Sequence, residues 1–123
     1  MLHEEISGAV VNAAMKVHSV LGPGLLESAY EACLAYELRK LGLDVETQVP
    51  LPVVYEGVRI DAGYRIDLKV AGVILVEIKA VSAIAPIHKA QLLSYLKLSG
   101  LKVGLLLNFN VVHLRDGLTR MIM

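Results

Sequence analysis

The sequence has little of what marks secreted and membrane proteins. It contains one cysteine, Cys33, which excludes an intramolecular disulfide and favours a reducing, cytoplasmic location. The apolar neighbours of Cys33 favour a small core residue over a reactive thiol. No apolar run approaches the roughly 20 residues that span a bilayer, so no membrane partner is expected. The N-terminal stretch MLHEEISGAV carries acids where a signal peptide needs basic residues, and export is therefore not expected.

Strong charge of either sign is also missing. Lysine and arginine number 12, as do aspartate and glutamate. With no basic tail, the sequence does not indicate strong non-specific binding to nucleic acid. Tryptophan is absent and phenylalanine occurs once, whereas 55% of residues are apolar, which predicts an aliphatic core with an apolar surface for self-association. Residues 1–123 are expected to form a single domain.

Helical and extended patterns succeed one another along the chain. Apolar spacing and helix-stop signals predict helices over about 6–21, 25–41 and 86–98, with extended segments over 45–60, 64–70, 73–81 and 101–109. The last residues predict a closing hairpin around Asp116-Gly117. This order predicts an α/β domain with one mixed central sheet flanked by helices.

The segment VILVEIKAV, residues 73–81, places two charges in an otherwise apolar strand. Glu77 and Lys79 are two positions apart and therefore point to the same side of that strand. Charges in a core are costly unless they are paired. A cross-strand ion pair explains these two residues as well as a functional site does, so both interpretations stay open.

Two further carboxylates stand near these strands in the predicted fold. Glu27 shares the apolar face of the second helix with Tyr30. With Gly24 as N-cap, Glu27 would cap the helix from position N3, and on this helix alone the cap is favoured. Asp67 lies on the polar face of its strand beside Arg65, where a solvated ion pair is an equal alternative.

The last predicted helix carries Gln91 and Tyr95 on one face, with His88 one turn earlier. A solvent-facing polar stripe is the default interpretation of such a pattern. His18, His88 and His113 have no His-x-x-His or cysteine partners, so no histidine metal site is expected.

Together, Glu27, Asp67 and Glu77 predict a metal site at one edge of the sheet. A hard cation such as Mg²⁺ relieves their excess negative charge, and proteins bind it through one or two carboxylates plus waters and substrate phosphate. Lys79 would then lie close enough to deprotonate a water or to stabilise the charge that develops on phosphate.

The turn between the two charged strands tests this prediction. With a two-residue turn, Asp67 would lie opposite Val76 and point away from Glu77. A three-residue loop centred on Gly72, or a bulge, instead places Asp67 opposite Glu77. We therefore predict an odd loop or a bulge in this hairpin.

The charged positions resemble a known signature. Asp67, followed by Glu77-x-Lys79 on the next strand, resembles the D…(D/E)-x-K motif of the PD-(D/E)XK nuclease superfamily. Ile66 stands where the eponymous proline would be, a position that varies widely in this superfamily.

A second element resembles one branch of that superfamily. GLLESAY, with Gly24, Glu27 and Tyr30, resembles the G-x-x-E-x-x-Y element of the GxxExxY family. LGPGLLESAYE, LAYELRKLGL, YRIDLKV, VEIKA and AQLLSYLKLSGLKVGLLLNFN follow in that family's order. The resemblance covers the chain from about Ile6 onward.

The resemblance implies a restriction-endonuclease-like core of αβββαβ order, with an extra N-terminal helix and a C-terminal β-hairpin. It implies phosphodiester hydrolysis with Mg²⁺ or Mn²⁺ as cofactor. It assigns four positions to the metal: Asp67, Glu77, the backbone carbonyl of Ile78 and, directly or through water, Glu27. Lys79 resembles the catalytic lysine that acts with these acids, while Gln91 and Tyr95 resemble a supporting Q-x-x-x-Y element, and Tyr30 belongs to the branch motif.

Two functions remain open at this point. The first is a metal-dependent nuclease, which is supported because no acid or lysine of the signature is missing. DNA is its favoured substrate. The second is a non-catalytic nucleic-acid-binding or protein-interaction module that retains the fold, since fold alone does not establish activity. The neutral charge leaves little to grip nucleic acid, so a homodimer or a partner subunit is expected to supply that grip.

Overall fold

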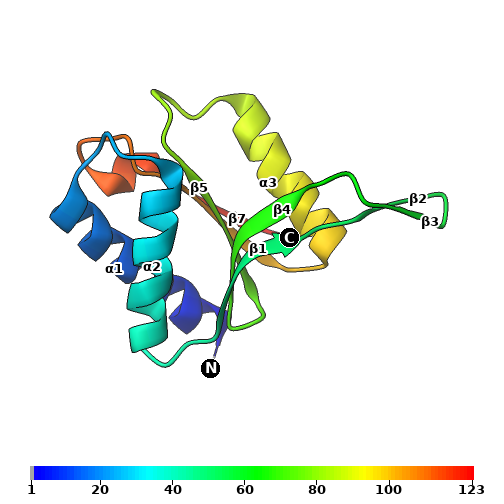
Figure 1. The fold of residues 1–123 in the computed structure, drawn as a ribbon, viewed down its shortest axis with the longest axis horizontal. Coiled ribbons are helices and arrows are strands. Elements are labelled where there is room, and N and C mark those ends of the chain that lie inside the picture. The colour runs from blue at the N-terminus through cyan, green and yellow to red at the C-terminus, as the bar shows by residue number, and fades with distance from the viewer. Residues whose placement is uncertain (1) are drawn as a thin grey trace.

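The computed structural model describes residues 2–123. Along these residues the elements are α1 (His3–Leu21), α2 (Glu27–Lys40), β1 (Val45–Pro50), β2 (Val53–Tyr55), β3 (Val58–Ile60), β4 (Arg65–Val70), β5 (Ile74–Lys79), α3 (Pro86–Ser99), β6 (Val103–Asn108), the 3₁₀ helix η1 (Leu114–Gly117) and β7 (Leu118–Ile122) (Figure 1). None of the helices in this range is long and apolar enough to cross a membrane.

A mixed sheet with the strand order β1-β4-β5-β6-β7 forms the centre of the molecule. β5 and β6 run parallel, whereas the other neighbouring strands run antiparallel. The parallel pair is connected through α3, because parallel neighbours need a long crossover. In chain order, α2, β1, β4, β5, α3 and β6 make up the expected αβββαβ core. The prediction of an α/β fold with a mixed sheet and an extra N-terminal helix is confirmed.

Helices cover both faces of this sheet (Figure 1). The alternation of side chains along β5 decides which residue meets which helix. Ile74, Val76 and Ile78 lie in one core cluster with residues of α1 and α2, whereas Leu75 lies in a second cluster with residues of α3. Glu77 is two residues from Leu75 and therefore points to the α3 face.

The alternation along β4 breaks at Asp67. Ile66, Leu68 and Val70 are all buried. However, Leu68 and Val70 lie in the cluster with α1 and α2, and Ile66 lies in the cluster with α3. These three side chains therefore do not share one face, as a regular alternation along the strand would require. Next to Asp67, Gln48 of β1 has a φ of 51°, a left-handed conformation that distorts the strand pair locally.

The C-terminal hairpin is wider than predicted. β7 pairs antiparallel with β6, and the segment between them contains η1. The N–H of Asp116 donates to the carbonyl of His113 (3.0 Å) within this helical turn. Asp116 and Gly117 therefore belong to a 3₁₀ helix, and the prediction of a tight hairpin turn at these two residues is wrong.

β2 and β3 form a separate two-stranded hairpin that projects from the body of the molecule (Figure 1). Glu56 and Gly57 form its turn, with φ values of 49° and 77°. Positive φ at both turn residues matches the twist of a two-residue hairpin. Val54, Tyr55 and Val58 are exposed along this projection. In chain order the hairpin lies between β1 and β4.

Candidate active site

The β4–β5 hairpin places Asp67 opposite Glu77. The chain turns through residues 71–73, the first two of which have positive φ. The last paired residues before the strands part are Leu68 and Val76. Asp67 and Glu77 are the next opposed positions in this register. The prediction of an odd loop in this hairpin is confirmed.

The two carboxylates fill the gap where β4 and β5 separate. Asp67 Oδ2 accepts a hydrogen bond from the N–H of Ile78 (2.8 Å). Glu77 Oε1 accepts one from the N–H of Asp67 (3.2 Å). Each carboxylate oxygen takes the place of a carbonyl of the opposite strand, so both acids are held by backbone at the point where the sheet opens.

Glu77 is a buried acid that forms no ion pair within residues 2–123. It is 4% exposed, and its burial, reinforced by the negative charge of Asp67, raises the pKa of its carboxyl to about 8. The ion pairs formed within residues 2–123 involve neither Glu77 nor Asp67. The two alternatives to a functional site, a cross-strand ion pair at Glu77 and Lys79 and the Asp67–Arg65 ion pair, are therefore not formed.

Glu27 reaches from α2 to the end of β5. Its Oε2 accepts a hydrogen bond from the N–H of Ala80 (3.0 Å). The N-cap of α2 is Leu26 rather than Gly24. Glu27 is therefore the first helical residue, and the interpretation that it caps its own helix from position N3 is wrong. Its carboxylate instead ties the helix to the segment that follows Lys79.

Glu31 and Gln48 are hydrogen-bonded in one group with Asp67, and neither was predicted. Gln48 Nε2 donates to Glu31 Oε1 (2.6 Å) and to Asp67 Oδ1 (3.2 Å). Burial raises the pKa of the Glu31 carboxyl, the hydrogen bond from Gln48 opposes this rise, and the charge of Asp67 adds to it. Glu31 lies four residues after Glu27 on the same helix face, which was the available signal. Nothing in the local sequence marks Gln48.

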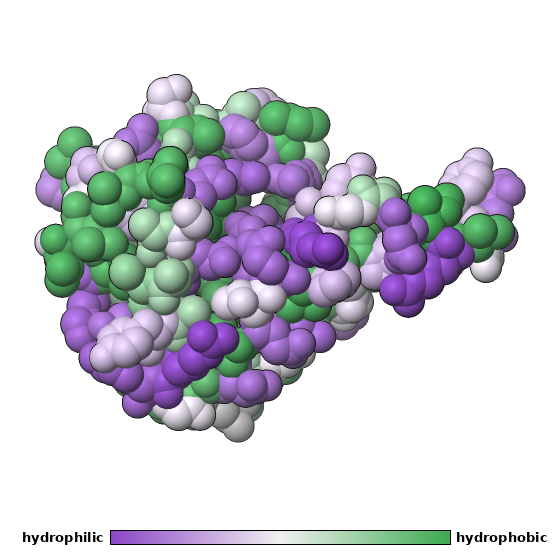
Figure 2. All heavy atoms as spheres, in the orientation of Figure 1, coloured by the Kyte–Doolittle hydropathy of each residue, from purple (hydrophilic) through white to green (hydrophobic). Residues whose placement is uncertain are grey.

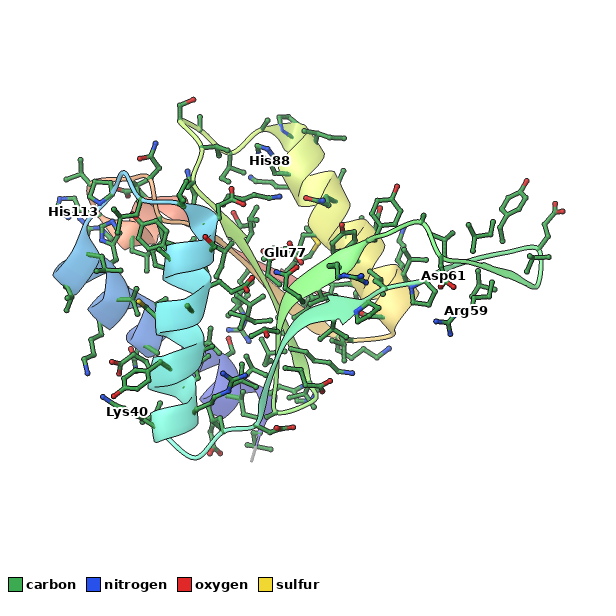
Figure 3. All side chains as sticks on the ribbon, viewed as in Figure 1. Lys40, Arg59, Asp61, Glu77, His88 and His113 are labelled. Carbon is green, nitrogen blue, oxygen red and sulfur yellow. The ribbon has the colours of Figure 1, made fainter. Side chains whose placement is uncertain are left out.

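Lys79 is connected to α3 through polar side chains. Its Nζ donates to Gln91 Oε1 (3.0 Å), and Gln91 Nε2 donates to the hydroxyl of Tyr95 (3.2 Å). Tyr95 is buried, so the solvent-facing stripe predicted as the default for Gln91 and Tyr95 is wrong. Figure 3 places Glu77 between α2 and α3, and Figure 2 shows a hollow in this region bordered largely by hydrophilic residues.

A protein-family model matches almost the whole chain. The model of the PD-(D/E)XK nuclease superfamily matches residues 4–121. The chain belongs to this superfamily. Membership implies a nuclease-like function on nucleic acid, and nucleases of this superfamily typically use divalent metals. No curated protein and no solved structure matches the chain.

Tyr30 fixes the loop that precedes α2 in this superfamily member. Its hydroxyl donates to the carbonyl of Gly22 (2.6 Å) and accepts from the N–H of Leu25 (3.1 Å). Its ring stacks on Phe109 with 4.4 Å between centroids. These contacts place the Tyr30 hydroxyl at the loop, so it supports the site from the start of α2 rather than from among the acids.

The G-x-x-E-x-x-Y positions therefore have a common structural effect. Gly24 has a φ of 98°, a conformation that side chains other than glycine rarely adopt. Tyr30 binds the loop on both sides of Gly24, and the helix begins at Glu27 immediately afterwards. The three residues together set the position from which Glu27 reaches Ala80.

Asn108 binds Val81, the residue after the one that Glu27 binds, and was also not predicted. Its Oδ1 accepts from the N–H of Val81 (3.1 Å), and its Nδ2 donates to the carbonyl of Val81 (2.9 Å). Asn108 is 1% exposed, and a polar side chain so deeply buried at the end of β6 needs such partners. It fixes the chain directly after Ala80.

The possible metal ligands where β4 and β5 separate are oxygen atoms, which suit a hard cation. The carbonyl of Lys79 accepts from the N–H of Phe109 on the β6 side. By strand alternation, the carbonyl of Ile78 points to the β4 side, as does the N–H that binds Asp67. Within residues 2–123, no three His, Cys, Asp or Glu side chains are grouped to hold a metal. The fitting donors are thus two carboxylates, of Asp67 and Glu77, and one carbonyl.

Stability should fall with rising pH in metal-free buffer. Since the Glu77 pKa is about 8 when folded and near its ordinary 4.5 when unfolded, only the unfolded chain releases the proton between these values. The free energy of unfolding should therefore decrease by up to about 1.4 kcal/mol per pH unit over this window. Urea titrations with EDTA from about pH 5 to about pH 8 measure the decrease, and Glu77→Gln should flatten the profile. An equally steep profile in Glu77→Gln would contradict the assignment.

Removal of the Tyr30 hydroxyl should destabilise the fold measurably. Tyr30→Phe leaves the carbonyl of Gly22 and the N–H of Leu25 without this partner, at a cost of about 1–3 kcal/mol. Tyr36→Phe is the matched control, because Tyr36 lies on the same helix and is 61% exposed. Thermal or urea unfolding of both variants checks the difference, and equal stability of the two would refute the role given to Tyr30.

Proposed function

We propose that the protein is a divalent-metal-dependent nuclease of the GxxExxY branch that hydrolyses phosphodiester bonds in DNA. One observation carries the proposal: Asp67 and Glu77 are paired where β4 and β5 separate. Two adjacent acids, one of them buried, are costly in a metal-free protein. A cation that both carboxylates bind offsets this cost.

Asp67, Glu77 and the carbonyl of Ile78 would hold Mg²⁺ or Mn²⁺ in this proposal. Glu27 is bound to the N–H of Ala80, which favours contact with the metal through water over direct ligation. When bound, the metal would supply a Lewis acid that stabilises negative charge on the phosphate and lowers the pKa of water.

Lys79 would supply the positively charged group of the site in this proposal. One N–H of its ammonium is given to Gln91 Oε1 (3.0 Å). An ammonium has further N–H donors, which can reach a phosphate oxygen or a water. Its positive charge stabilises the negative charge that develops in the transition state, and as a neutral amine it can accept a proton from the attacking water. Gln91, held by the hydroxyl of Tyr95, orients the ammonium.

Binding of the nucleic-acid substrate requires contacts beyond electrostatic attraction to this chain. The chain carries no net charge, and affinity for nucleic acid rises with the number of phosphates that basic residues neutralise. We propose that a second copy of the chain or a partner subunit supplies further contacts to DNA. The single cysteine, Cys33, is free and is consistent with function in a reducing cytoplasm.

Divalent metal should stabilise the folded protein through Asp67. At about ten times its Kd, Mn²⁺ should add about 1.4 kcal/mol to the free energy of unfolding, because it binds the folded state selectively. The melting temperature, measured against Mn²⁺ concentration, should rise by several degrees. Asp67→Asn should largely abolish the rise, and Asp61→Asn, an exposed acid on the projecting hairpin, should not. An unchanged rise in Asp67→Asn would place the metal elsewhere.

Cleavage should depend on Lys79 and Glu77. Single-stranded, double-stranded and branched DNA and RNA incubated with Mg²⁺ or Mn²⁺ test for phosphodiester hydrolysis. Lys79→Ala should lower the rate by about 10²–10⁴-fold, the usual contribution of a proton-transferring side chain. Glu77→Ala should lower it at least as far. Lys69→Ala, which removes a half-buried lysine from the adjacent strand, is the matched control.

The same assay separates nuclease from non-catalytic module. Metal-dependent cutting that Lys79→Ala removes supports the enzyme. If the wild type binds Mn²⁺ and nucleic acid but cuts no substrate, the chain is a binding module that retains the fold. If Mn²⁺ neither binds nor stabilises it and nothing is cut, the metal-dependent nuclease is refuted.

A further inference from the structure

A pocket with mainly apolar walls adjoins the site at Gln91. It has a volume of about 340 Å³, near the lower end of the range for small-molecule sites. It lies between α3 and the base of the β2–β3 hairpin, with walls that include Val53, Tyr64, Ile87, Gln91, Tyr95 and Leu98. Gln91 belongs both to this pocket and to the hydrogen-bonded group around Lys79. Whatever enters the pocket therefore lies beside the proposed reaction centre.

Tyr64 presents an aromatic surface in this pocket. It lies in the segment that connects β3 to β4 and is 46% exposed. Its ring centroid is 6.0 Å from that of Tyr95, with the planes tilted by 60°. Tyr95 is buried and tied to Gln91, so it provides a rigid support for the ring of Tyr64. A supported, half-exposed tyrosine offers contact area at little cost in side-chain entropy.

The chemistry of the walls selects what the pocket can bind. No lysine, arginine, aspartate or glutamate lines it, so a phosphate or another charged group gains nothing there. A flat, largely uncharged ring gains stacking on tyrosine together with apolar contacts. In a nucleic acid the nucleobase is the group with these properties, and stacking on aromatic side chains is how proteins hold unpaired bases.

We propose that this pocket binds an unpaired nucleobase adjacent to the scissile phosphate, with Tyr64 as the stacking residue. The inference rests on the proposed nuclease function and names its substrate class: single strands, or junctions and ends with unpaired nucleotides. A base inside a duplex is covered on both faces by its neighbours and must leave the stack before it can enter such a pocket. Stacking also supplies affinity that the neutral chain cannot obtain from phosphates.

Tryptophan fluorescence tests the contact directly. The chain contains no tryptophan, so Tyr64→Trp introduces a unique probe into the pocket. Titration with a short oligothymidylate in EDTA, where no hydrolysis occurs, should quench its fluorescence as a base stacks on the indole. Tyr36→Trp places the same probe on the exposed side of α2 and should not respond. Equal responses of the two variants, or none from Tyr64→Trp, would overturn the proposal.

Affinity provides a second, independent readout. Anisotropy of labelled oligothymidylate should show that Tyr64→Ala weakens binding roughly 5- to 150-fold, whereas Tyr64→Phe retains most of it. Tyr36→Ala should bind like the wild type. The wild type should prefer oligothymidylate to a blunt duplex of equal length, and this preference should shrink in Tyr64→Ala. No preference in the wild type, or an unchanged preference in Tyr64→Ala, would count against the base pocket.

The tests of the base pocket and the tests of the nuclease can have different outcomes. Both are made without metal, so Tyr64-dependent binding supports the base pocket even if no substrate is cut. Conversely, cutting of blunt duplex that requires Lys79 but is unaffected by Tyr64→Ala would leave the nuclease standing and overturn the inference on its substrate.

Discussion

The hydrogen bonds between carboxylates and backbone at the end of the β4–β5 hairpin are the constraint on which the rest of the site depends. Asp67 and Glu77 each replace a carbonyl of the opposite strand, so the sheet opens while its N–H groups stay paired. Uncharged side chains could close such an end at lower cost, because a buried acid beside a second acid opposes folding at neutral pH. The pKa of about 8 at Glu77 reflects this conflict between stability and charge. A cation that binds the folded state, as proposed above, would resolve the conflict.

The surrounding residues hold the opened edge in place from three sides. Tyr30 fixes the loop from which α2 directs Glu27 to Ala80, and Asn108 holds the next residue from β6. From α3, Gln91 binds the ammonium of Lys79. Each contact starts from a helix or a strand, and those of Glu27, Asn108 and Gln91 reach another part of the chain. Such support limits the motion of the functional groups, as a preorganised site requires.

That Glu77 and Lys79 lie on one side of their strand was predictable because strand alternation is a local property. The odd loop between the strands was predicted on the premise that Asp67 and Glu77 share a site, and the register of the two strands confirms it. What could not be predicted is which partner each polar group would choose. Glu27 was read as a cap because a helix N-terminus offers nearby N–H groups, yet it binds Ala80. Gln48 and Asn108 carried no signal, since their partners come from other elements.

The sequence by itself determined the mixed α/β fold and the placement of Glu77 and Lys79 on one side of their strand. Apolar periodicity and turn residues act over a few neighbouring positions, so they can be read from the chain alone. Only the tertiary structure decided that the strands part at Asp67 and that Tyr64 rests on Tyr95 beside the site. These features arise from packing between distant segments, where burial and hydrogen-bond satisfaction over the whole core outweigh local preference.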